Sequence, residues 1–466
     1  MARQVIVFAL VSLTIFMFTG CGPGNNTETD TPMEIYLQTG APLFQSNLTW
    51  GITITQYYEW YEYGNTEAMQ QAKNLLKSIS SIYNIHIMGW GAGNPWPAKS
   101  DAINFHDIRS RVNLAKTLGG EPWITFCTAP GWMKGAGDWS MERAPRPEFE
   151  DDFAYLCAEI AKEFTDVKVF QVWNEFKGMW VSGKLDYERY TRLYNKVYTA
   201  VKTVRPDALI GGFYAVLEGD GTQTAFGGLD INQHTAEPLI DDSKTAITYY
   251  LNNAISSDLF LADRANVDYH NDGYWNFQTS QFRATRDQAM LLTKYFRKAT
   301  SELTELTHLP VVWSEYYGTY GDDNSEFMPM NQPYIGAHYA SIMYNMIMGA
   351  AGRDIYALLW LEKEADIRHA LFTDTTASNG GQATPHYYAM KKLIDNFPKG
   401  TELFCANISS PGIAQNDIGN YAEALISEKA VYVINKTNTQ LMLTMNDRHY
   451  TLNPYAVEVF EQGKNP

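Results

Sequence analysis

The sequence is poor in cysteine and in positive charge, and each shortage excludes a class of protein. Four cysteines occur in 466 residues, without the Cys-x-x-Cys spacing or nearby histidine pair of a zinc site. The formal net charge is −16, from 36 basic and 52 acidic residues, so no basic field attracts a polyanion. Nucleic acid is therefore excluded as the main partner. No cofactor or catalytic metal is implied, and a structural calcium in an acidic loop such as Asp322–Asp323 stays open as an alternative.

Three motifs of other enzyme classes are also missing. The sequence has no Gly-x-Ser-x-Gly nucleophile elbow and no His-Glu-x-x-His zinc motif. No glycine-rich phosphate loop follows any of the expected strands. Serine hydrolases of the elbow type, zinc proteases and dinucleotide-binding enzymes are therefore disfavoured.

A hydrophobic segment long enough to cross a membrane is missing as well. The apolar run Val5–Phe18 falls short of the ~20 residues that a spanning helix needs. It ends at Phe18-Thr19-Gly20-Cys21, which resembles a bacterial lipobox with Phe in place of the usual Leu. The resemblance implies a signal peptide at 1–20, lipidation of Cys21 and a flexible tether over 21–33. The protein is expected in the bacterial cell envelope, on the outer-membrane surface or in the periplasm, with the lipid as its only membrane contact.

Aromatic residues are abundant: 30 Tyr, 22 Phe and 12 Trp make up 14% of the chain. Flat rings stack on the C–H faces of sugars, so this composition suits a carbohydrate cleft. The alternative is that a large barrel simply needs bulky core side chains. A carbohydrate is thus the expected partner, and the oligomeric state is not readable from the sequence.

Apolar runs alternate with amphipathic helical segments from about residue 50 to residue 395, which predicts parallel strands with crossover helices. Eight helical segments are expected, from Thr66–Tyr83 to His386–Asn396, with the sixth spanning Gln281–Leu306. The expected strands are Gly51–Thr55, Ile85–Gly89, Trp123–Thr128, Val167–Trp173, Leu209–Tyr214, Val267–His270, Val311–Ser314 and Ile355–Leu361. This α/β pattern predicts a (β/α)8 TIM barrel over 34–398, and a doubly wound open sheet is the alternative.

The pattern changes after Pro398. Residues 399–466 alternate apolar and polar positions without long helices, which predicts a small antiparallel, β-sandwich-like domain. The stretch Glu34–Gln38 is a candidate for an additional strand of that domain.

Two glutamates stand where a barrel enzyme places its catalytic residues. Glu175 ends Val169-Phe-Gln-Val-Trp-Asn-Glu175 after the fourth expected strand, and Glu315 follows Pro310-Val-Val-Trp-Ser after the seventh. Active sites of TIM barrels lie at the C-terminal ends of the strands. Cleavage of a glycosidic bond needs two carboxyl groups, one to protonate the leaving oxygen and one to attack or to activate water. Either glutamate alone would be interpreted as a surface charge at a strand end, whereas the pair indicates cleavage of a glycosidic bond.

This arrangement resembles glycoside hydrolase clan A, whose members carry Asn-Glu after strand 4 and a second Glu after strand 7. The barrel with a β-domain most resembles family 39, the family of β-xylosidases and α-L-iduronidases. The resemblance implies retention by double displacement, with Glu175 as acid/base, Glu315 as nucleophile and Asn174 on the sugar 2-hydroxyl. Glu175 is then expected to have a raised pKa, and Glu315 is expected to be ionised and stabilised by donors such as a nearby tyrosine hydroxyl. Tyr317 is a candidate substrate-binding residue.

Other strand ends supply candidate substrate-binding residues. His270 ends the sixth expected strand, where the clan commonly has a His or Tyr that orients the nucleophile. Trp360 ends the eighth, where the clan often places an aromatic floor under the sugar. Trp90 and Trp132 lie in the loops after the second and third expected strands, and loop packing is the alternative for each.

The sequence departs from the family pattern at two positions. His86 stands in an early strand where an Arg near the nucleophile is frequent, and Phe176 follows the acid/base where Pro is frequent. Lys177 is interpreted as a solvated lysine, with recognition of an acidic sugar as the alternative. The sugar at the −1 subsite and the choice of exo or endo cleavage stay open. A non-catalytic glycan-binding barrel on the cell surface is the competing hypothesis.

Overall fold

The computed structural model describes residues 32–54, 64–89, 91–138, 140, 142–181, 184–217, 241–268, 286–320, 332–361 and 371–462. The predicted signal peptide, most of the tether and Cys21 lie outside these residues, as do Trp90, His270 and Asp322–Asp323. Within the described ranges, no helix is both long and apolar enough to span a membrane.

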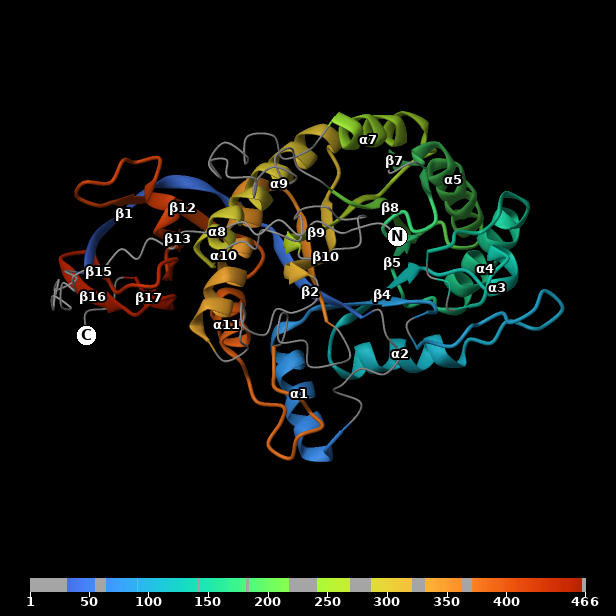
Figure 1. Ribbon diagram of the computed structural model, residues 1–466, viewed down its shortest axis with the longest axis horizontal. Helices are drawn as coiled ribbons and strands as arrows, with labels where there is room; N and C mark the ends of the chain where they lie inside the picture. Colours follow the sequence, from blue (N-terminus) through green and yellow to red (C-terminus); the bar gives the residue numbers. More distant parts are fainter. Residues whose placement is uncertain are drawn as a thin grey trace, which may run out of the picture. The chain divides into compact units, whose positions relative to one another are not determined.

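A closed barrel of eight parallel strands forms the larger part of the fold (Figure 1). Its strands follow the chain around the barrel, so each pairs with its sequence neighbours and the last pairs with the first. In order they are β2 (Leu48–Ile54), β3 (Ile82–His86), β4 (Glu121–Phe126), β5 (Val169–Val172), β8 (Leu209–Val216), β9 (Leu259–Asp268), β10 (Val311–Tyr320) and β11 (Ile355–Trp360). The expected (β/α)8 barrel is therefore confirmed.

Helices occupy the connections between these strands (Figure 1). The first shows why: Asn65 caps it by accepting hydrogen bonds from the backbone N–H groups of Glu67 and Ala68, and a helical stripe from Ala68 to Ile79 is buried. The helices are α1 (Thr66–Ile79), α2 (His106–Thr117), α3 (Gly131–Lys134), α4 (Glu150–Glu163), α5 (Tyr187–Val204), α7 (Asp241–Asn253), α8 (Arg286–Leu292), α9 (Lys294–Thr307), α10 (Pro333–Ala350) and α11 (Pro385–Asn396). Short elements are η1 (Pro147–Phe149), η2 (Ile418–Asn420) and the two-stranded pair β6 (Trp180–Val181) and β7 (Lys184–Leu185).

The helix expected over Gln281–Leu306 is divided in the structure into α8 and α9. The division falls at Thr293, whose hydroxyl donates to the carbonyl of Met290 at 2.8 Å. A threonine that bonds to the backbone of the preceding turn competes with the regular helical pattern, which accounts for the break.

The sixth barrel strand was predicted too late in the chain: within the described residues, Val267–His270 overlaps the observed strand only at Val267 and Asp268. The strand is β9, which begins at Leu259 and pairs with β8 through Gly211 and with β10 through Val311. The apolar run from Leu259 to Ala262 enters the barrel, where all four side chains are buried. This shift places Asp263, which the sequence-based prediction left out, in the middle of the strand.

The second sheet combines both ends of the described chain. Its strand order is β16-β15-β1-β12-β13-β14-β17, and β1 pairs antiparallel with β12 but parallel with β15. The expected additional strand at Glu34–Gln38 is present as part of β1 (Met33–Ser46). The other strands are β12 (Thr401–Ser409), β13 (Ala422–Ile426), β14 (Ala430–Asn435), β15 (Leu441–Met445), β16 (Arg448–Leu452) and β17 (Val457–Glu461).

A buried polar network joins this sheet to the barrel helix α10. Lys436 Nζ lies 2.8 Å from Glu423 Oε1, and these side chains are 0% and 4% exposed. Glu423 also accepts a hydrogen bond from Ser341 Oγ at 2.6 Å and one from Asn345 Nδ2 at 3.1 Å. Both Ser341 and Asn345 belong to α10, so the carboxylate of β13 holds the sheet and the helix together.

Replacement of Lys436 by methionine should lower the free energy of unfolding by about 3–5 kcal/mol, because it leaves the Glu423 charge buried without its cation. The measurement is urea denaturation followed by circular dichroism. Lys391→Met is the matched control, since Lys391 and Asp395 form a partly exposed pair on α11. That variant should cost about 0.5 kcal/mol or less. Equal losses in both variants would contradict a special role for the buried pair.

Candidate active site

The turn that carries Glu175 has an unusual backbone. It follows β5, and Trp173, Glu175 and Phe176 adopt positive φ angles of 67°, 47° and 53°. Such angles are unfavourable for residues with a side chain and persist only where the surroundings enforce them. Two indole N–H groups hold this backbone conformation in place. Trp173 donates to the carbonyl of Lys177 at 2.9 Å, and Trp180 donates to the carbonyl of Glu175 at 3.2 Å. The turn therefore fixes the direction of the Glu175 side chain.

Glu315 lies in β10 at an irregularity of the strand pairing. Trp313 pairs with Ala262 and Glu315 pairs with Asp263, so Ser314 is an additional residue on β10. The extra residue is held by Thr53 of β2, whose hydroxyl donates to the carbonyl of Ser314. A bulge of this kind changes the direction of the side chain that follows it. It also brings Glu315 and Asp263 side by side.

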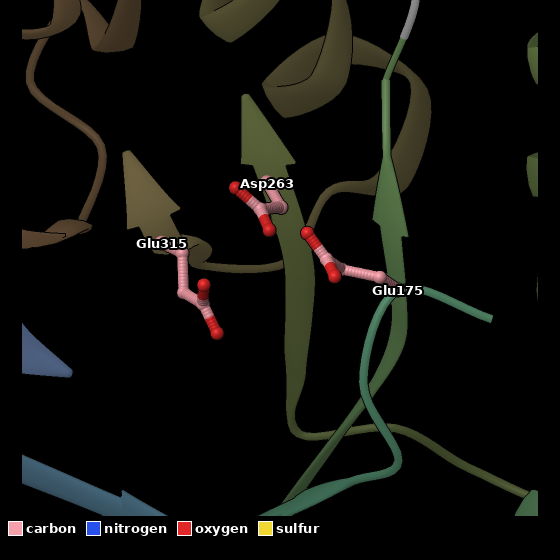
Figure 2. A group of neighbouring side chains, drawn as sticks. All are labelled: Glu175, Asp263 and Glu315. Carbon is pink, nitrogen blue, oxygen red and sulfur yellow. The ribbon is translucent and has the colours of Figure 1, made fainter. Parts of the chain in front are cut away.

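Three carboxyl groups consequently meet at one place. Glu175, Asp263 and Glu315 each contribute an oxygen, and these oxygens lie within 4.8 Å of one another. Figure 2 shows Glu175 and Asp263 with their carboxyl groups facing each other and Glu315 beside them. Asp263 is 0% exposed and Glu315 3%, so most of this acidic charge is removed from water. We refer to these three side chains as the carboxyl cluster.

Glu315 is surrounded by hydrogen-bond donors. Its Oε1 accepts from Asn174 Nδ2 at 3.2 Å and from the Tyr214 hydroxyl at 2.7 Å, and its Oε2 accepts from the Tyr317 hydroxyl. Donors aimed at both oxygens favour the ionised carboxylate. The structure thus places Asn174 and Tyr317 beside Glu315, together with Tyr214 of β8, for which the sequence gives no motif.

His86 also lies next to Glu315, with Nε2 3.7 Å from Oε1. Burial, followed by the charges of Arg111 and Lys177, lowers the pKa of His86 to about 3, so the imidazole is neutral. An arginine does stand behind it: Arg111 of α2 is buried and donates to the backbone carbonyls of His86 and Ile87. At the position where the family frequently has an arginine, this chain therefore has a neutral imidazole next to Glu315, and the Arg111 guanidinium is bonded to the backbone behind it.

The environment of Glu315 produces opposing effects on its acidity. Burial and then the charge of Glu175 raise the pKa of Glu315 to about 8, while the hydroxyls of Tyr317 and Tyr214 oppose the rise. The ionised form of Glu315 therefore dominates only at a pH above about 8, where the three donors stabilise the carboxylate.

Lys177 is not the solvated lysine that the sequence suggested. Its side chain is 15% exposed, and Nζ lies 2.6 Å from Glu175 Oε2 and 3.5 Å from Glu142 Oε1. Burial acts to raise the pKa of Glu175, but Lys177 and the hydrogen bond with Asp263 outweigh it, so the pKa is lowered. The expectation of a raised pKa for Glu175 is therefore wrong for the unliganded site, because an ammonium group that no motif indicated is paired with the carboxylate.

Asp263 has the opposite behaviour. Burial, followed by the charges of Glu175 and Glu315, raises the pKa of Asp263 well above its ordinary value. Two neighbouring carboxylates disfavour a third negative charge in a buried volume. The neutral form of Asp263 is therefore favoured over its carboxylate.

The remaining predicted residues divide into three groups. Trp360 lies near the cluster, because its ring packs edge-on against Tyr317 with 5.1 Å between centroids. Trp132 packs against Trp96 and Phe149 and donates to the carbonyl of Trp96, so its described contacts are with its own loops. His270 and Trp90 lie outside the described residues, and their roles stay predictions.

The carboxyl cluster is also the group of acidic side chains, within the described residues, that is close enough to hold a cation. The Lys177 ammonium already lies against Glu175 and supplies positive charge there. A carboxylate cluster with one built-in ammonium suits proton transfer at least as well as metal binding.

No protein-family model matches the sequence, and no curated protein matches it. Solved structures do share the fold. SrfJ from Salmonella typhimurium gives a TM-score of 0.58 at 11% identity, over 94% of this chain and 94% of that one. A monomeric β-xylosidase from Caulobacter crescentus CB15 gives 0.54 at 13% identity, over 89% and 83%. A GH39 enzyme from Xanthomonas axonopodis pv. citri gives 0.54 at 14% identity, over 89% and 77%.

These likenesses establish the fold of the chain, a (β/α)8 barrel like those of the three structures named. Identities of 14% and below do not by themselves transfer an activity. The assignment to family 39 in particular stays a prediction.

Replacement of Tyr317 by phenylalanine should raise the pKa of Glu315 further above about 8. A hydrogen bond to a charged group is worth about 1.5–3 kcal/mol, which corresponds to a rise of about 1 to 2 in pKa. The measurement is a pH titration of 13C-labelled glutamate carboxyls by NMR, with the signal assigned by comparison with Glu315→Gln. It does not depend on any activity.

Tyr316→Phe is the matched control for this titration. Tyr316 is the preceding residue and equally buried, but its hydroxyl accepts from Trp50 Nε1 at 2.7 Å instead of contacting Glu315. An unchanged titration in Tyr317→Phe, or the same change in both variants, would contradict the described hydrogen bond.

Proposed function

We propose that the protein is a retaining glycoside hydrolase that cleaves oligo- or polysaccharides with Glu175 as acid/base and Glu315 as nucleophile. The observation that carries this proposal is the spacing of the two glutamates. Glu175 follows β5, and Glu315 lies in β10. One carboxyl oxygen of Glu175 lies within 4.8 Å of one carboxyl oxygen of Glu315. Retaining enzymes have carboxyl groups about 5–5.5 Å apart, whereas inverting enzymes need about 6.5–9.5 Å to admit a water.

The surroundings of Glu315 support the nucleophile role. Asn174, Tyr214 and Tyr317 aim donors at its oxygens and orient the carboxylate. In the first step a Glu315 oxygen forms a bond to the anomeric carbon while the bond to the leaving oxygen breaks. Glu175 gives a proton to that leaving oxygen. Asn174, which is next to both glutamates, is placed to donate to the sugar 2-hydroxyl as the reaction proceeds.

The second step returns the enzyme to its starting state. Glu175 removes a proton from water, the water oxygen bonds to the anomeric carbon, and the ester bond to Glu315 breaks. Two inversions at one carbon give net retention. Trp360, whose ring packs on Tyr317 at the end of β11, is proposed as the aromatic surface under the sugar.

The competing hypothesis of a glycan-binding barrel does not account for the carboxyl cluster. Burial of several acidic groups in one site costs free energy and weakens folding. A protein that only binds sugars gains nothing from two adjacent buried carboxyl groups, whereas double displacement requires two carboxyl groups at this spacing. The solved structures of similar fold include a β-xylosidase, which supports the same conclusion.

The Glu315→Ala variant should have no detectable activity on aryl glycosides and plant oligosaccharides that the wild type cleaves. Glu175→Ala should lose on the order of 10²–10⁴-fold on substrates with poor leaving groups. It should regain activity with azide on activated aryl glycosides and form a glycosyl azide. NMR of the first products checks the configuration, which should be retained in the wild type.

Glu121→Ala serves as the control, because Glu121 is an exposed residue at the opposite end of the barrel, where β4 begins. Inversion by the wild type, or full activity of Glu315→Ala, would refute the assignment of roles. Binding of glycans without hydrolysis of any panel member would favour the non-catalytic barrel.

We further propose that Cys21 is lipidated and holds the enzyme in the cell envelope. The support is the apolar run before Phe18-Thr19-Gly20-Cys21 and the polar tether after it. Full-length protein expressed in a bacterium should incorporate labelled palmitate and partition with membranes. Cys21→Ser should lose both properties, and a variant that keeps the label would show that the lipid is attached elsewhere.

A further inference from the structure

Asp263 is a buried acid that has no role in the double displacement proposed above. It is 0% exposed, and neither carboxyl oxygen accepts a hydrogen bond from an N–H or hydroxyl group of the described residues. An ionised carboxylate in such surroundings would cost several kcal/mol. The protonated form avoids that cost and has an O–H to donate, and the acceptor within reach is the facing carboxylate of Glu175 (Figure 2).

Glu175 itself is poorly prepared to be an acid. Lys177 Nζ lies 2.6 Å from its Oε2, and this contact stabilises the ionised carboxylate. A general acid must hold a proton when the substrate arrives. The lysine is no substitute, because the carboxylates around it keep its ammonium protonated. The proton therefore has to come from another group in the site.

We infer that Asp263 stores the proton that Glu175 delivers to the leaving oxygen, so that the two side chains act together as the acid/base. This inference rests on the proposed glycosidase function. It adds a residue that neither the motif around Glu175 nor the resemblance to clan A assigns.

The proton and charge balance of both steps supports this division. In the first step the Asp263 proton passes to Glu175 and from there to the leaving oxygen, while Glu315 becomes a neutral ester. At a pH above the Glu315 pKa of about 8, the cluster begins with Glu175 and Glu315 ionised and ends with Glu175 and Asp263 ionised. Two negative charges are present before and after, so the step never places three adjacent carboxylates in a buried volume.

The second step reverses the transfer. Glu175 takes a proton from the attacking water and passes it to Asp263, and Glu315 leaves as a carboxylate. The return of the Glu315 charge makes a neutral Asp263 favourable again, because the raised pKa of Asp263 depends in part on that charge. The charge of Glu315 and the protonation of Asp263 are thus coupled by electrostatic repulsion between the two carboxyl groups.

The charged and titratable groups that face Asp263 come from several elements. Lys177 contributes a positive charge that opposes the storage of a proton, whereas the two glutamates favour it. Arg264, the next residue on β9, donates to the carbonyl of Leu217 and lies over the ring of Tyr295. The facing groups are Glu175 and Lys177 after β5, Tyr214 of β8, and Glu315 and Tyr317 of β10. His86 of β3 lies beside Glu315.

A different role for Asp263 would be to accept a hydrogen bond from a sugar hydroxyl. That role predicts an equal loss for every substrate with the same sugar, because binding at the −1 subsite does not depend on the leaving group. Storage of the proton predicts a loss that depends on the leaving group, because a weakly basic leaving oxygen needs no protonation.

The first measurement is infrared difference spectroscopy at a pH above the Glu315 pKa of about 8, and it needs no substrate. The wild-type spectrum minus that of Asp263→Asn should contain a C=O band of a protonated carboxyl. Asp258→Asn is the control, since Asp258 directly precedes the opposite end of β9 and accepts from the backbone of Ile210. No such band should be lost in that variant. Absence of a protonated carboxyl at Asp263 would overturn the inference whatever the activity.

The second measurement is kcat/KM for aryl and alkyl glycosides of one sugar. Asp263→Asn should lower kcat/KM on the order of 10²–10⁴-fold for alkyl glycosides and leave dinitrophenyl glycosides within about threefold. Asp263→Ser is the second variant in case the amide disturbs folding, and Asp263→Glu should restore part of the loss. Equal losses for all leaving groups would show a sugar-binding role and overturn the inference.

The outcomes separate the inference from the proposed function. A wild type that hydrolyses glycosides with retention, together with an Asp263→Asn variant that lacks leaving-group dependence, refutes only the proton store. A wild type without glycosidase activity refutes the proposed function, and the proton store for that reaction falls with it. The infrared result then still reports the protonation state of Asp263.

Discussion

The central constraint of this site is electrostatic: three carboxyl groups lie so close together, and so far from water, that they cannot all be ionised. The positions of the surrounding side chains follow from this. One ammonium stabilises the Glu175 carboxylate, and three donors stabilise that of Glu315. The Asp263 oxygens accept no hydrogen bond from an N–H or hydroxyl group of the described residues, and this favours the neutral acid. Each group acquires a distinct protonation state from its neighbours rather than from its own chemistry.

The backbone brings the three carboxyl groups close together, and the electrostatic interactions among them then set their protonation states. The bulge at Ser314 aligns Glu315 with Asp263 on adjacent strands, and the left-handed turn after β5 directs Glu175 toward them. Indole N–H groups and the Thr53 hydroxyl hold these irregularities in place. A regular strand and a relaxed turn would separate the acids, and the mutual repulsion that differentiates them would weaken with distance.

The sequence was sufficient to predict the barrel, because its apolar runs and helical segments alternate with the right lengths. It also indicated Glu175 and Glu315, because each follows an expected apolar strand, whereas Asn174 was indicated by the resemblance to clan A. It could not reveal the positive φ angles of the turn, since no glycine marks Trp173, Glu175 or Phe176. The burial of Lys177 was hidden for the same reason, as it depends on how that turn folds back.

Asp263 was missed because the sixth strand was placed too late in the chain. The run Leu259–Ala262 followed by an acid is the same signal that identified the glutamates, so a consistent reading would have found it. The pKa directions were beyond any sequence argument. They depend on distances between groups far apart in the chain, such as Lys177 to Glu175 on one side and Asp263 on the other.

The position of β1 has a consequence for the order in which the molecule is completed. This strand is made first, yet its partners β12 and β15 are made last, after the whole barrel. During synthesis β1 has no sheet to join, and closing a loop over the entire barrel carries a large entropic cost that only the finished sheet offsets. The second sheet can therefore form completely only when the whole chain has been made. A chain interrupted anywhere before Leu441 leaves β1 with an open edge, exposed to aggregation and to proteases.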